Sequence, residues 1–190
     1  MERIGIRGKV VIAIIMIAGV SRFFPVMNFS PLAAMGLFGG AYLSKRWLAL
    51  TLPLLAVWFS DILLNNTIYA HMNEGFTFFY QGWEWQYGAY LAITLLGMLI
   101  FRRGVSGPKV LGSSLVASAL FFMISNFGIW ASGLLYPLTL EGLLACYAAG
   151  LPFLKGTLFG DMFYSGVLFG GFYLLQQRFS ELRPDRLRAN

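Results

Sequence analysis

The chain has 190 residues, of which 58% are hydrophobic and only 12% are charged, and its mean hydropathy is +0.69. A soluble domain carries about 25% charged residues, so this composition excludes an ordinary water-soluble domain and indicates an integral membrane protein. The net charge of +6 does not indicate a nucleic-acid partner, because membrane insertion itself selects an excess of basic residues.

Six apolar segments follow one another along the chain. They cover residues 9–20, 30–43, 47–64, 83–101, 110–131 and 156–176. A spanning helix needs about 20 apolar residues, so six spans account for nearly the whole length. We therefore predict an all-α integral membrane fold, with one transmembrane domain over residues 1–178 and a polar cytoplasmic tail over residues 179–190. The first segment lacks a small-residue cleavage site before Arg22, so we expect it to be retained.

The basic residues lie in alternate connections between these segments. All of the fourteen Lys and Arg residues except Arg22 and Lys155 lie before the first segment, between the second and third, between the fourth and fifth, or near and after the end of the sixth. Cationic connections stay on the cytoplasmic side during insertion. We therefore expect a multi-pass protein of the bacterial inner membrane with both termini in the cytoplasm. Its substrate or partner would meet the opposite, outer face.

Two further patterns concern helix packing. The apolar run at 138–149 is too short to span a bilayer, and it predicts an interfacial or re-entrant helix separate from the last span. Small residues recur four apart at Gly36 and Gly40 and at Gly166 and Gly170. This spacing lets helices approach closely, either within the bundle or against another membrane protein.

Several polar residues are expected in the outer half of the membrane or in the outer connections. Ionisable groups inside a bilayer usually line a cavity, and this predicts a set of substrate contacts that includes Asn28, Asp61, Asn66, Asn126 and Asp161. A purely structural interpretation stands beside it. Asp61 would then pair with Arg22, Asp161 with Lys155, and Asn126 would bond a neighbouring helix.

Aromatic residues are concentrated in one outer connection and in the helix that follows it. Eight of them lie between residues 76 and 90, namely Phe76, Phe78, Phe79, Tyr80, Trp83, Trp85, Tyr87 and Tyr90. An aromatic belt at the membrane interface explains some of these rings. Their density, mixed with polar side chains, predicts a pocket for a large planar molecule, with Tyr80, Trp83, Trp85 and Tyr87 as contacts.

The sequence contains few groups that could perform catalysis. His71 is its sole histidine, and Cys146, its sole cysteine, excludes an internal disulfide. The chain has no zinc-type His and Glu spacing, no Gly-x-Ser-x-Gly turn and no phosphate-binding Gly-Lys-Ser motif. We expect no enzyme and no intrinsic cofactor, although an intramembrane enzyme using Asp61 and Asp161 stays an alternative. If the substrate carries a metal, His71 is the candidate axial ligand.

A set of short motifs points to a known type of membrane protein. The motifs are Ser-Arg-Phe-Phe-Pro at 21–25, Asn-Phe-Ser-Pro-Leu-Ala-Ala at 28–34, Leu-Phe-Gly-Gly-Ala-Tyr-Leu at 37–43, Ser-Asp at 60–61, Phe-Phe-x-x-Ser-Asn-Phe-Gly-x-Trp at 121–130, Tyr-Pro at 136–137, Gly-Leu-Leu-x-Cys-Tyr at 142–147, Leu-Pro-Phe at 151–153 and Gly-Asp at 160–161. With them, residues 21–171 resemble six-helix proteins related to the substrate-binding S components of energy-coupling-factor vitamin transporters. The closest functional analogue is the solitary S component for cobalamin.

The resemblance implies an S-component-like bundle with cytoplasmic termini and an outer substrate pocket. It also implies a membrane protein that captures and takes up a vitamin or cofactor precursor, with cobalamin or a related corrinoid as the specific expectation. In the cobalamin type, a cysteine between helices three and four contacts the cobalt. This chain has no cysteine there, and His71 would take that role. The Ala-xxx-Ala docking motif of helix one is also absent, since Ala13 and Ala18 have a different spacing.

The expected partners are therefore the vitamin, the lipid bilayer, and either an ATP-driven energy-coupling module or none. No nucleic acid is expected. The main rival is a non-enzymatic membrane scaffold, such as a small subunit of an envelope complex, whose glycine-rich faces would bind another helix.

Overall fold

The computed structural model describes residues 4–23 and 29–183, and the described chain is helical. Its α-helices are α1 (Ile6–Val20), α2 (Leu32–Tyr42), α3 (Arg46–Asn66), α4 (Trp83–Phe101), α5 (Gly107–Ala131) and α6 (Leu140–Arg178). Three short 3-10 helices accompany them, η1 (Ser21–Phe23), η2 (Ala70–Met72) and η3 (Ser180–Leu182). Part of the predicted tail is thus helical, and Leu182 is buried.

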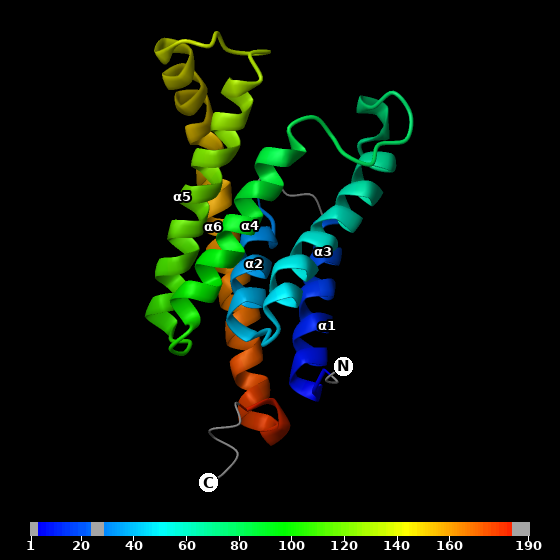
Figure 1. Cartoon of the computed structure of the whole chain (residues 1–190), viewed down its shortest axis with the longest axis vertical. Coiled ribbons are helices and arrows are strands. Elements are labelled where there is room, and N and C mark those ends of the chain that lie inside the picture. Colours follow the sequence, from blue (N-terminus) through cyan, green and yellow to red (C-terminus); the bar gives the residue numbers. More distant parts are fainter. Residues whose placement is uncertain (1–3, 24–28, 184–190) are drawn as a thin grey trace.

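The helices run alternately up and down, so the molecule has two distinct ends (Figure 1). One end carries the α2–α3 and α4–α5 turns, the start of α1 and the end of α6, and we call it the basic end. The other carries the 67–82 connection and the α5–α6 turn, and we call it the aromatic end. The alternate connections in which the sequence concentrates Lys and Arg thus gather at one end of the described chain.

The short helix α2 lies at the centre of the bundle. Residues 32–39 are all buried, and α2 contacts each of α1, α3, α4, α5 and α6. With 11 residues it is only about 16 Å long, well short of the predicted span over 30–43. A helix this apolar on every side is stable only when other helices surround it, and this arrangement provides that cover.

Glycines bring α2 and α4 into direct backbone contact. A Cβ atom on Gly40 would lie 2.6 Å from the Thr94 carbonyl oxygen, and one on Gly97 would lie 2.9 Å from the Leu37 Cα atom. Gly36 is similarly close to the Thr94 side chain, at 2.9 Å. The predicted close packing at Gly36 and Gly40 is therefore confirmed as packing within the bundle.

The outer surface of the bundle is strongly apolar. Leu99 is 60% exposed, Phe159 68% and Leu174 67%, whereas a soluble monomer rarely exposes a large continuous apolar surface. Three helices, α3, α5 and α6, are long and apolar enough to cross a membrane. The structure thus has the character of a helical membrane protein.

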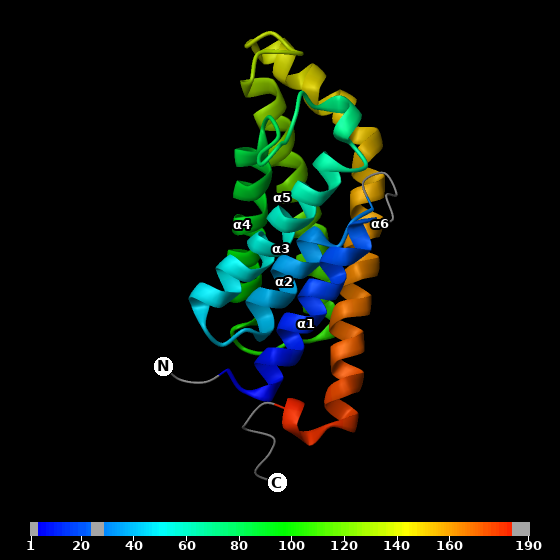
Figure 2. The same ribbon diagram turned by 90° about the vertical axis from the view of Figure 1, so that its right-hand side faces the viewer.

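One prediction about the fold is wrong. Residues 138–149 do not form a helix separate from the last span, because α6 continues without a break from Leu140 to Arg178, over 39 residues that include Pro152. Thr139 caps its start, with its side-chain oxygen accepting a hydrogen bond from the Gly142 amide at 3.2 Å. Pro152 removes one backbone hydrogen bond from the helix, and α6 packs against α5. Figure 2 shows α6 running nearly the whole length of the molecule.

Candidate functional site

A buried ion pair joins η1 to α3. The Arg22 Nη1 atom lies 2.6 Å from Asp61 Oδ1, and the two side chains are 15% and 6% exposed. Arg22 also donates to the Ser60 hydroxyl at 2.5 Å and to the Val57 carbonyl at 3.3 Å. Charges this deep are stable only when paired and hydrogen-bonded, and the pairing of Arg22 with Asp61 follows the structural interpretation of the sequence.

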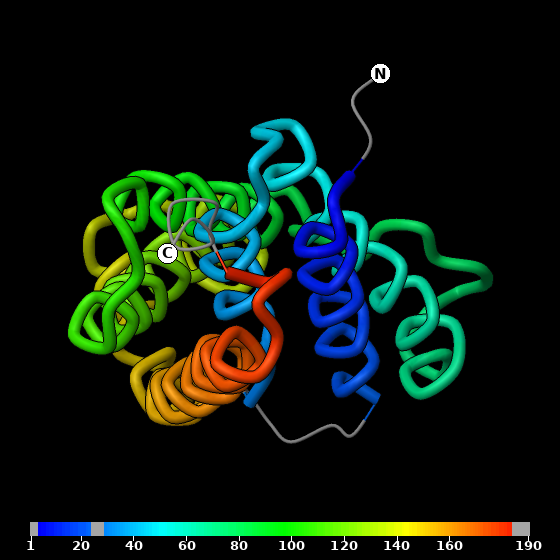
Figure 3. The backbone as a smooth tube through the Cα atoms, turned by 90° about the horizontal axis from the view of Figure 1, so that it is seen from below, coloured from blue at the N-terminus to red at the C-terminus, as the bar shows by residue number. Residues whose placement is uncertain are grey.

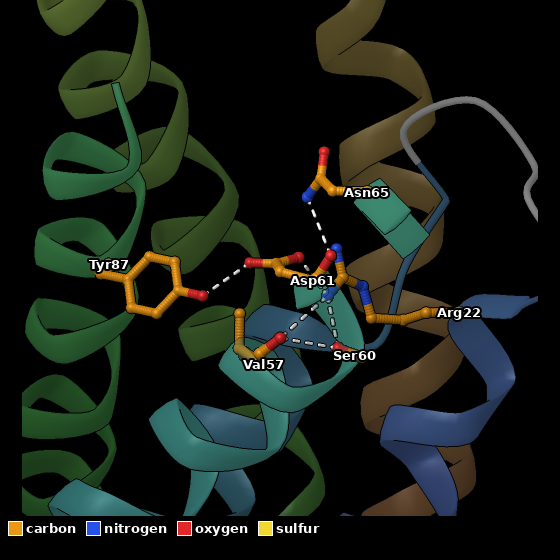
Figure 4. A network of polar contacts seen from close by, with 6 residues as sticks. All are labelled: Arg22, Val57, Ser60, Asp61, Asn65 and Tyr87. Atoms are coloured by element: carbon orange, nitrogen blue, oxygen red, sulfur yellow. Dashed lines mark hydrogen bonds and ion pairs between the residues drawn. The ribbon is translucent and has the colours of Figure 1, made fainter. Parts of the chain in front are cut away.

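The second carboxylate oxygen of Asp61 reaches α4. The Tyr87 hydroxyl donates to Asp61 Oδ2 at 2.7 Å, and the Asn65 side chain donates to the Asp61 carbonyl at 2.8 Å (Figure 4). Arg22 and Tyr87 thus approach the carboxylate from two different elements. The resulting network connects η1, α3 and α4 at one point.

The end of α3 is fixed by its own polar side chains. Asn65, Asn66 and Thr67 each donate to the carbonyl four residues earlier, at 2.8, 2.7 and 2.5 Å. The Thr67 bond satisfies the Leu63 carbonyl, which the ending helix leaves without a backbone partner. The three bonds also hold the start of the connection that carries the aromatic residues.

A series of aromatic rings leads from the surface to this network. The Phe79 and Trp83 ring centroids are 4.4 Å apart, and those of Trp83 and Tyr87 are 5.6 Å apart. Phe79 is 49% exposed and Trp83 is 36% exposed, whereas Tyr87 is half-buried. The rings therefore form a continuous path from solvent to Asp61.

Tyr80 lies close to the same charges. Burial raises the pKa of the Tyr80 hydroxyl above its ordinary value, and the Asp61 carboxylate raises it further. The hydroxyl is therefore a neutral hydrogen-bond donor. Tyr80, Tyr87 and Trp83 are the predicted aromatic contacts that the structure brings to the Asp61 network.

Trp85 points elsewhere. Its ring packs against Phe127 of α5, with centroids 5.3 Å apart, and a Cβ atom on Gly128 would overlap it. Trp85 is two residues from Trp83 and Tyr87, so it lies on the opposite side of α4. Its role in the structure is to join α4 to α5.

Asn66 acts as a structural brace. Its side-chain nitrogen donates to the Thr77 carbonyl at 2.8 Å, and its oxygen accepts from the Thr77 amide at 2.8 Å. This two-bond pairing holds the middle of the aromatic connection against the end of α3. The amide of Asn66 is thus occupied by protein groups rather than pointing toward a ligand.

His71 lies at the surface in η2, next to Met72, which is 73% exposed. Among the residues that the structure describes, no three His, Cys, Asp or Glu side chains are placed to hold a metal ion. Asn28, another predicted contact, lies outside the described residues.

Asp161 and Asn126 belong to the α5–α6 interface. The Ser118 hydroxyl donates to Asp161 Oδ2 at 2.6 Å, and Asp161 is 4% exposed. Asn126 donates to the Phe122 carbonyl of its own helix at 2.8 Å, and its side-chain oxygen faces Gly150 of α6. The predicted contact residues therefore lie in two separate places: Asp61 near the aromatic rings, and Asp161 and Asn126 at the α5–α6 interface.

The predicted pairing of Asp161 with Lys155 is wrong. In the described chain Asp161 is buried and Lys155 is exposed, and no ion pair joins them. Six residues in one helix place two side chains about 120° apart around its axis. The partner is Ser118. Its spacing of four residues from Ser114 predicts a closely packed helix face, but it does not predict the bond to Asp161.

The chain belongs to a family of unknown function, DUF6580, whose family model matches residues 3–182. No curated protein and no solved structure matches the chain.

Proposed function

We propose that the protein captures a small molecule with a large planar or aromatic surface, such as a vitamin or cofactor precursor, at the aromatic end of the bundle. The exposed rings of the α3–α4 connection stack on the ligand, and the hydroxyls beneath them bind its polar edge. The protein acts by binding and uptake, and not as an enzyme.

The path of rings from solvent to a buried ion pair carries this proposal. Phe79, Trp83 and Tyr87 are in sequential contact, and the last of them donates to Asp61. A membrane-interface belt needs exposed rings only, and it gives no reason for those rings to lead to a buried charge. A ligand on Phe79 and Trp83 would therefore lie beside the Tyr87 hydroxyl, whose oxygen can still accept a hydrogen bond while its proton is donated to Asp61.

The proposed topology is that of six spans in a bacterial inner membrane, with the basic end and both termini in the cytoplasm. The gathering of basic turns at one end supports this orientation. The helices α1 and α2, with 15 and 11 residues, are too short to span alone. Within the bundle the longer helices shield them, which makes short or broken segments tolerable in a membrane.

The specific ligand that we propose is cobalamin or a related corrinoid, as the resemblance to the solitary S component suggests. The exposed position of His71 in the aromatic connection supports this choice, because imidazole suits a transition metal carried by the ligand. The sequence contains no phosphate-binding loop. Energy from ATP would therefore come from a separate energy-coupling module, or the protein would work alone.

The test is to purify the full chain in mild detergent and to identify any bound small molecule by absorbance and mass spectrometry. We expect a stoichiometric vitamin, with weaker binding in Trp83→Ala. The matched control is Trp47→Ala, which removes a ring that is 61% exposed at the start of α3, at the basic end. Loss of a corrinoid in His71→Ala would assign the axial ligand.

Other outcomes separate the alternatives. A bound vitamin that is not a corrinoid would retain capture and remove the metal argument for His71. Equal binding losses in Trp83→Ala and Trp47→Ala would place the site away from the ring path. A protein that carries no ligand and binds none from a vitamin panel would overturn capture in favour of the membrane scaffold.

A further inference from the structure

A second region of the molecule, at the basic end, has the features of a binding site. A cavity of about 1340 Å³ lies between the last turns of α2 and α4, the first two turns of α5 and the second half of α6. Figure 3 views the molecule from this end. The cavity lies away from the ring path, which belongs to the opposite end of the bundle.

The charged residues that the structure describes around the cavity are basic. Arg7, Arg102 and Arg183 line it, and none of the described lining residues is acidic. Arg7 is held with its guanidinium 5.7 Å from the centre of the Tyr42 ring. Arg183 is held by its bonds to the Gln176 and Gln177 carbonyls, at 3.0 and 3.1 Å. Three guanidinium groups around one cavity favour an anion, and phosphate above all.

The buried part of the cavity lining is apolar except for two serine hydroxyls. Tyr42, Phe101 and Phe169 form an aromatic wall, with centroid separations of 5.6 Å and 5.2 Å from Phe169 to the other two rings. A ligand that fills this cavity must therefore combine an anionic group with an apolar body.

The two hydroxyls belong to Ser114 of α5 and Ser165 of α6. Both residues line the cavity, their exposures are 0% and 1%, and neither side-chain oxygen has a hydrogen-bond partner among the described residues. A buried hydroxyl without a partner is unfavourable by about 1–3 kcal/mol, so folded proteins rarely retain one without a reason. One turn farther along both helices, the equivalent positions Ser118 and Asp161 are bonded to each other.

The cavity is also open along one helix of its wall. Gly166 and Gly170 line it on α6, both are exposed, and a Cβ atom on either would meet no heavy atom within 4 Å. Val167 and Tyr173, on the same helix, are more than half exposed. The opening of the cavity therefore faces the same surroundings as the apolar surface of the bundle. A long apolar chain could enter there sideways.

From these features we infer that the basic-end cavity binds an anionic phospholipid. The arginines bind its phosphate, the aromatic wall and the open glycines take an acyl chain, and Ser114 and Ser165 donate to oxygens deeper in the molecule, such as ester carbonyls. Basic pockets between membrane helices suit anionic headgroups, which are enriched on the cytoplasmic side of membranes. This inference does not depend on the ligand of the aromatic end.

The first experiment compares two neighbouring arginines. The purified full chain is titrated with phosphatidylglycerol, with phosphatidylcholine and with inorganic phosphate, and bound lipid is measured by native mass spectrometry. Phosphatidylglycerol should bind most tightly. Arg102→Gln should weaken it about fivefold, the effect of one basic residue on an anionic headgroup, whereas Arg103→Gln, which changes an exposed arginine that does not line the cavity, should change it less than twofold.

The second experiment compares two neighbouring glycines. Gly170→Leu fills the cavity from a position with open space, and it should reduce phosphatidylglycerol retention at least as much as Arg102→Gln. Gly171→Leu introduces the same side chain at an exposed position that also has open space but does not line the cavity. It should leave lipid retention unchanged, and both variants should fold, because an added Cβ atom meets no heavy atom within 4 Å at either position.

Three results would overturn the inference. Equal retention of phosphatidylglycerol and phosphatidylcholine would remove the role of the arginines. Equal effects of the two glycine variants would remove the cavity. Inorganic phosphate that displaces the lipid completely and binds as tightly would assign the site to a soluble phosphate compound instead of a lipid.

Discussion

Asp61 and Asp161 are both buried carboxyl groups, but different polar partners stabilise them. Asp61 is 5% exposed. It pairs with Arg22, accepts a hydrogen bond from the Tyr87 hydroxyl, and lies where η1, α3 and α4 meet. Asp161 is 4% exposed, and its carboxyl accepts from a single serine hydroxyl between two helices. The first is a charged network beside an aromatic surface, and the second is one bond in a packed interface.

The difference shows which carboxylate is suited to function. A buried pair that is stable only through several directed contacts will respond when a ligand changes any one of them. A carboxyl with one neutral neighbour mainly contributes to the packing of two helices. The following substitutions test this distinction, beginning with the largest expected effect.

Removing the arginine should have the largest effect. In Arg22→Gln, Asp61 stays buried without its counter-charge, which is expected to lower the free energy of unfolding by about 3–5 kcal/mol. Denaturant or thermal unfolding in mild detergent measures this loss. The double variant Arg22→Gln with Asp61→Asn should recover at least half of it, because no unpaired charge is then buried. A double variant as unstable as the single one would show that the ion pair is not the cause.

Removing the tyrosine hydroxyl should have a smaller effect. Tyr87→Phe loses a hydrogen bond to a charged group and is expected to destabilise the protein by about 2 kcal/mol. The matched control is Tyr147→Phe, whose hydroxyl donates to the neutral Met123 carbonyl at 2.8 Å and should matter about half as much. Equal losses of stability in the two variants would mean that the charge of Asp61 does not strengthen its hydrogen bond with Tyr87.

Removing the partner of the second carboxyl should have an effect of similar or smaller size. Ser118→Ala leaves a buried carboxyl without its hydroxyl donor, and we expect a loss of about 1–2 kcal/mol in unfolding free energy. Ligand binding at the aromatic end should be unchanged, whereas Tyr87→Phe should weaken it. Reduced ligand affinity in Ser118→Ala would join the two carboxylates into one site.

Replacing each carboxylate by an amide should change the unfolding stability in different directions. Asp161→Asn keeps an acceptor for Ser118 and removes a buried ionisable group, so the stability should stay equal or rise by at most about 1 kcal/mol. Asp61→Asn leaves Arg22 buried without its counter-charge and should destabilise the protein by several kcal/mol. Parallel melting curves of the two variants provide the measurement.

The sequence was informative where a physical rule acts locally. The alternating basic connections predicted which turns lie at the same end. The opposite charges of Asp61 and Arg22 led to the prediction that they pair. Helical periodicity could also have separated Trp85 from Trp83 and Tyr87, because residues four apart share a face of a helix and residues two apart do not. Grouping all three rings by density alone was the error.

Other features depended on packing that no local pattern expresses. Gly150 and Pro152 normally end a helix, yet α6 passes through both, because Gly150 lets the helix lie close against Asn126 and Phe122 of α5. Once α6 is continuous, Lys155 and Asp161 lie on different sides of it. The bond between Tyr87 and Asp61 likewise required the rotation of α4 about its axis, which follows from contacts with α2 and α5.

The length of α6 can be compared with the thickness of a membrane. Its 39 residues extend about 58 Å at 1.5 Å per residue, against a hydrocarbon layer of about 30 Å. Even at a tilt of 40°, the steepest usually seen, the helix would use only about 39 Å to cross that layer. If α6 spans the membrane, about 19 Å of its length therefore lies in the headgroup layers or beyond them. Of the two acidic or basic residues in its middle third, Asp161 is buried and Lys155 is exposed, so Lys155 is the residue expected at the boundary between the hydrocarbon and the headgroups.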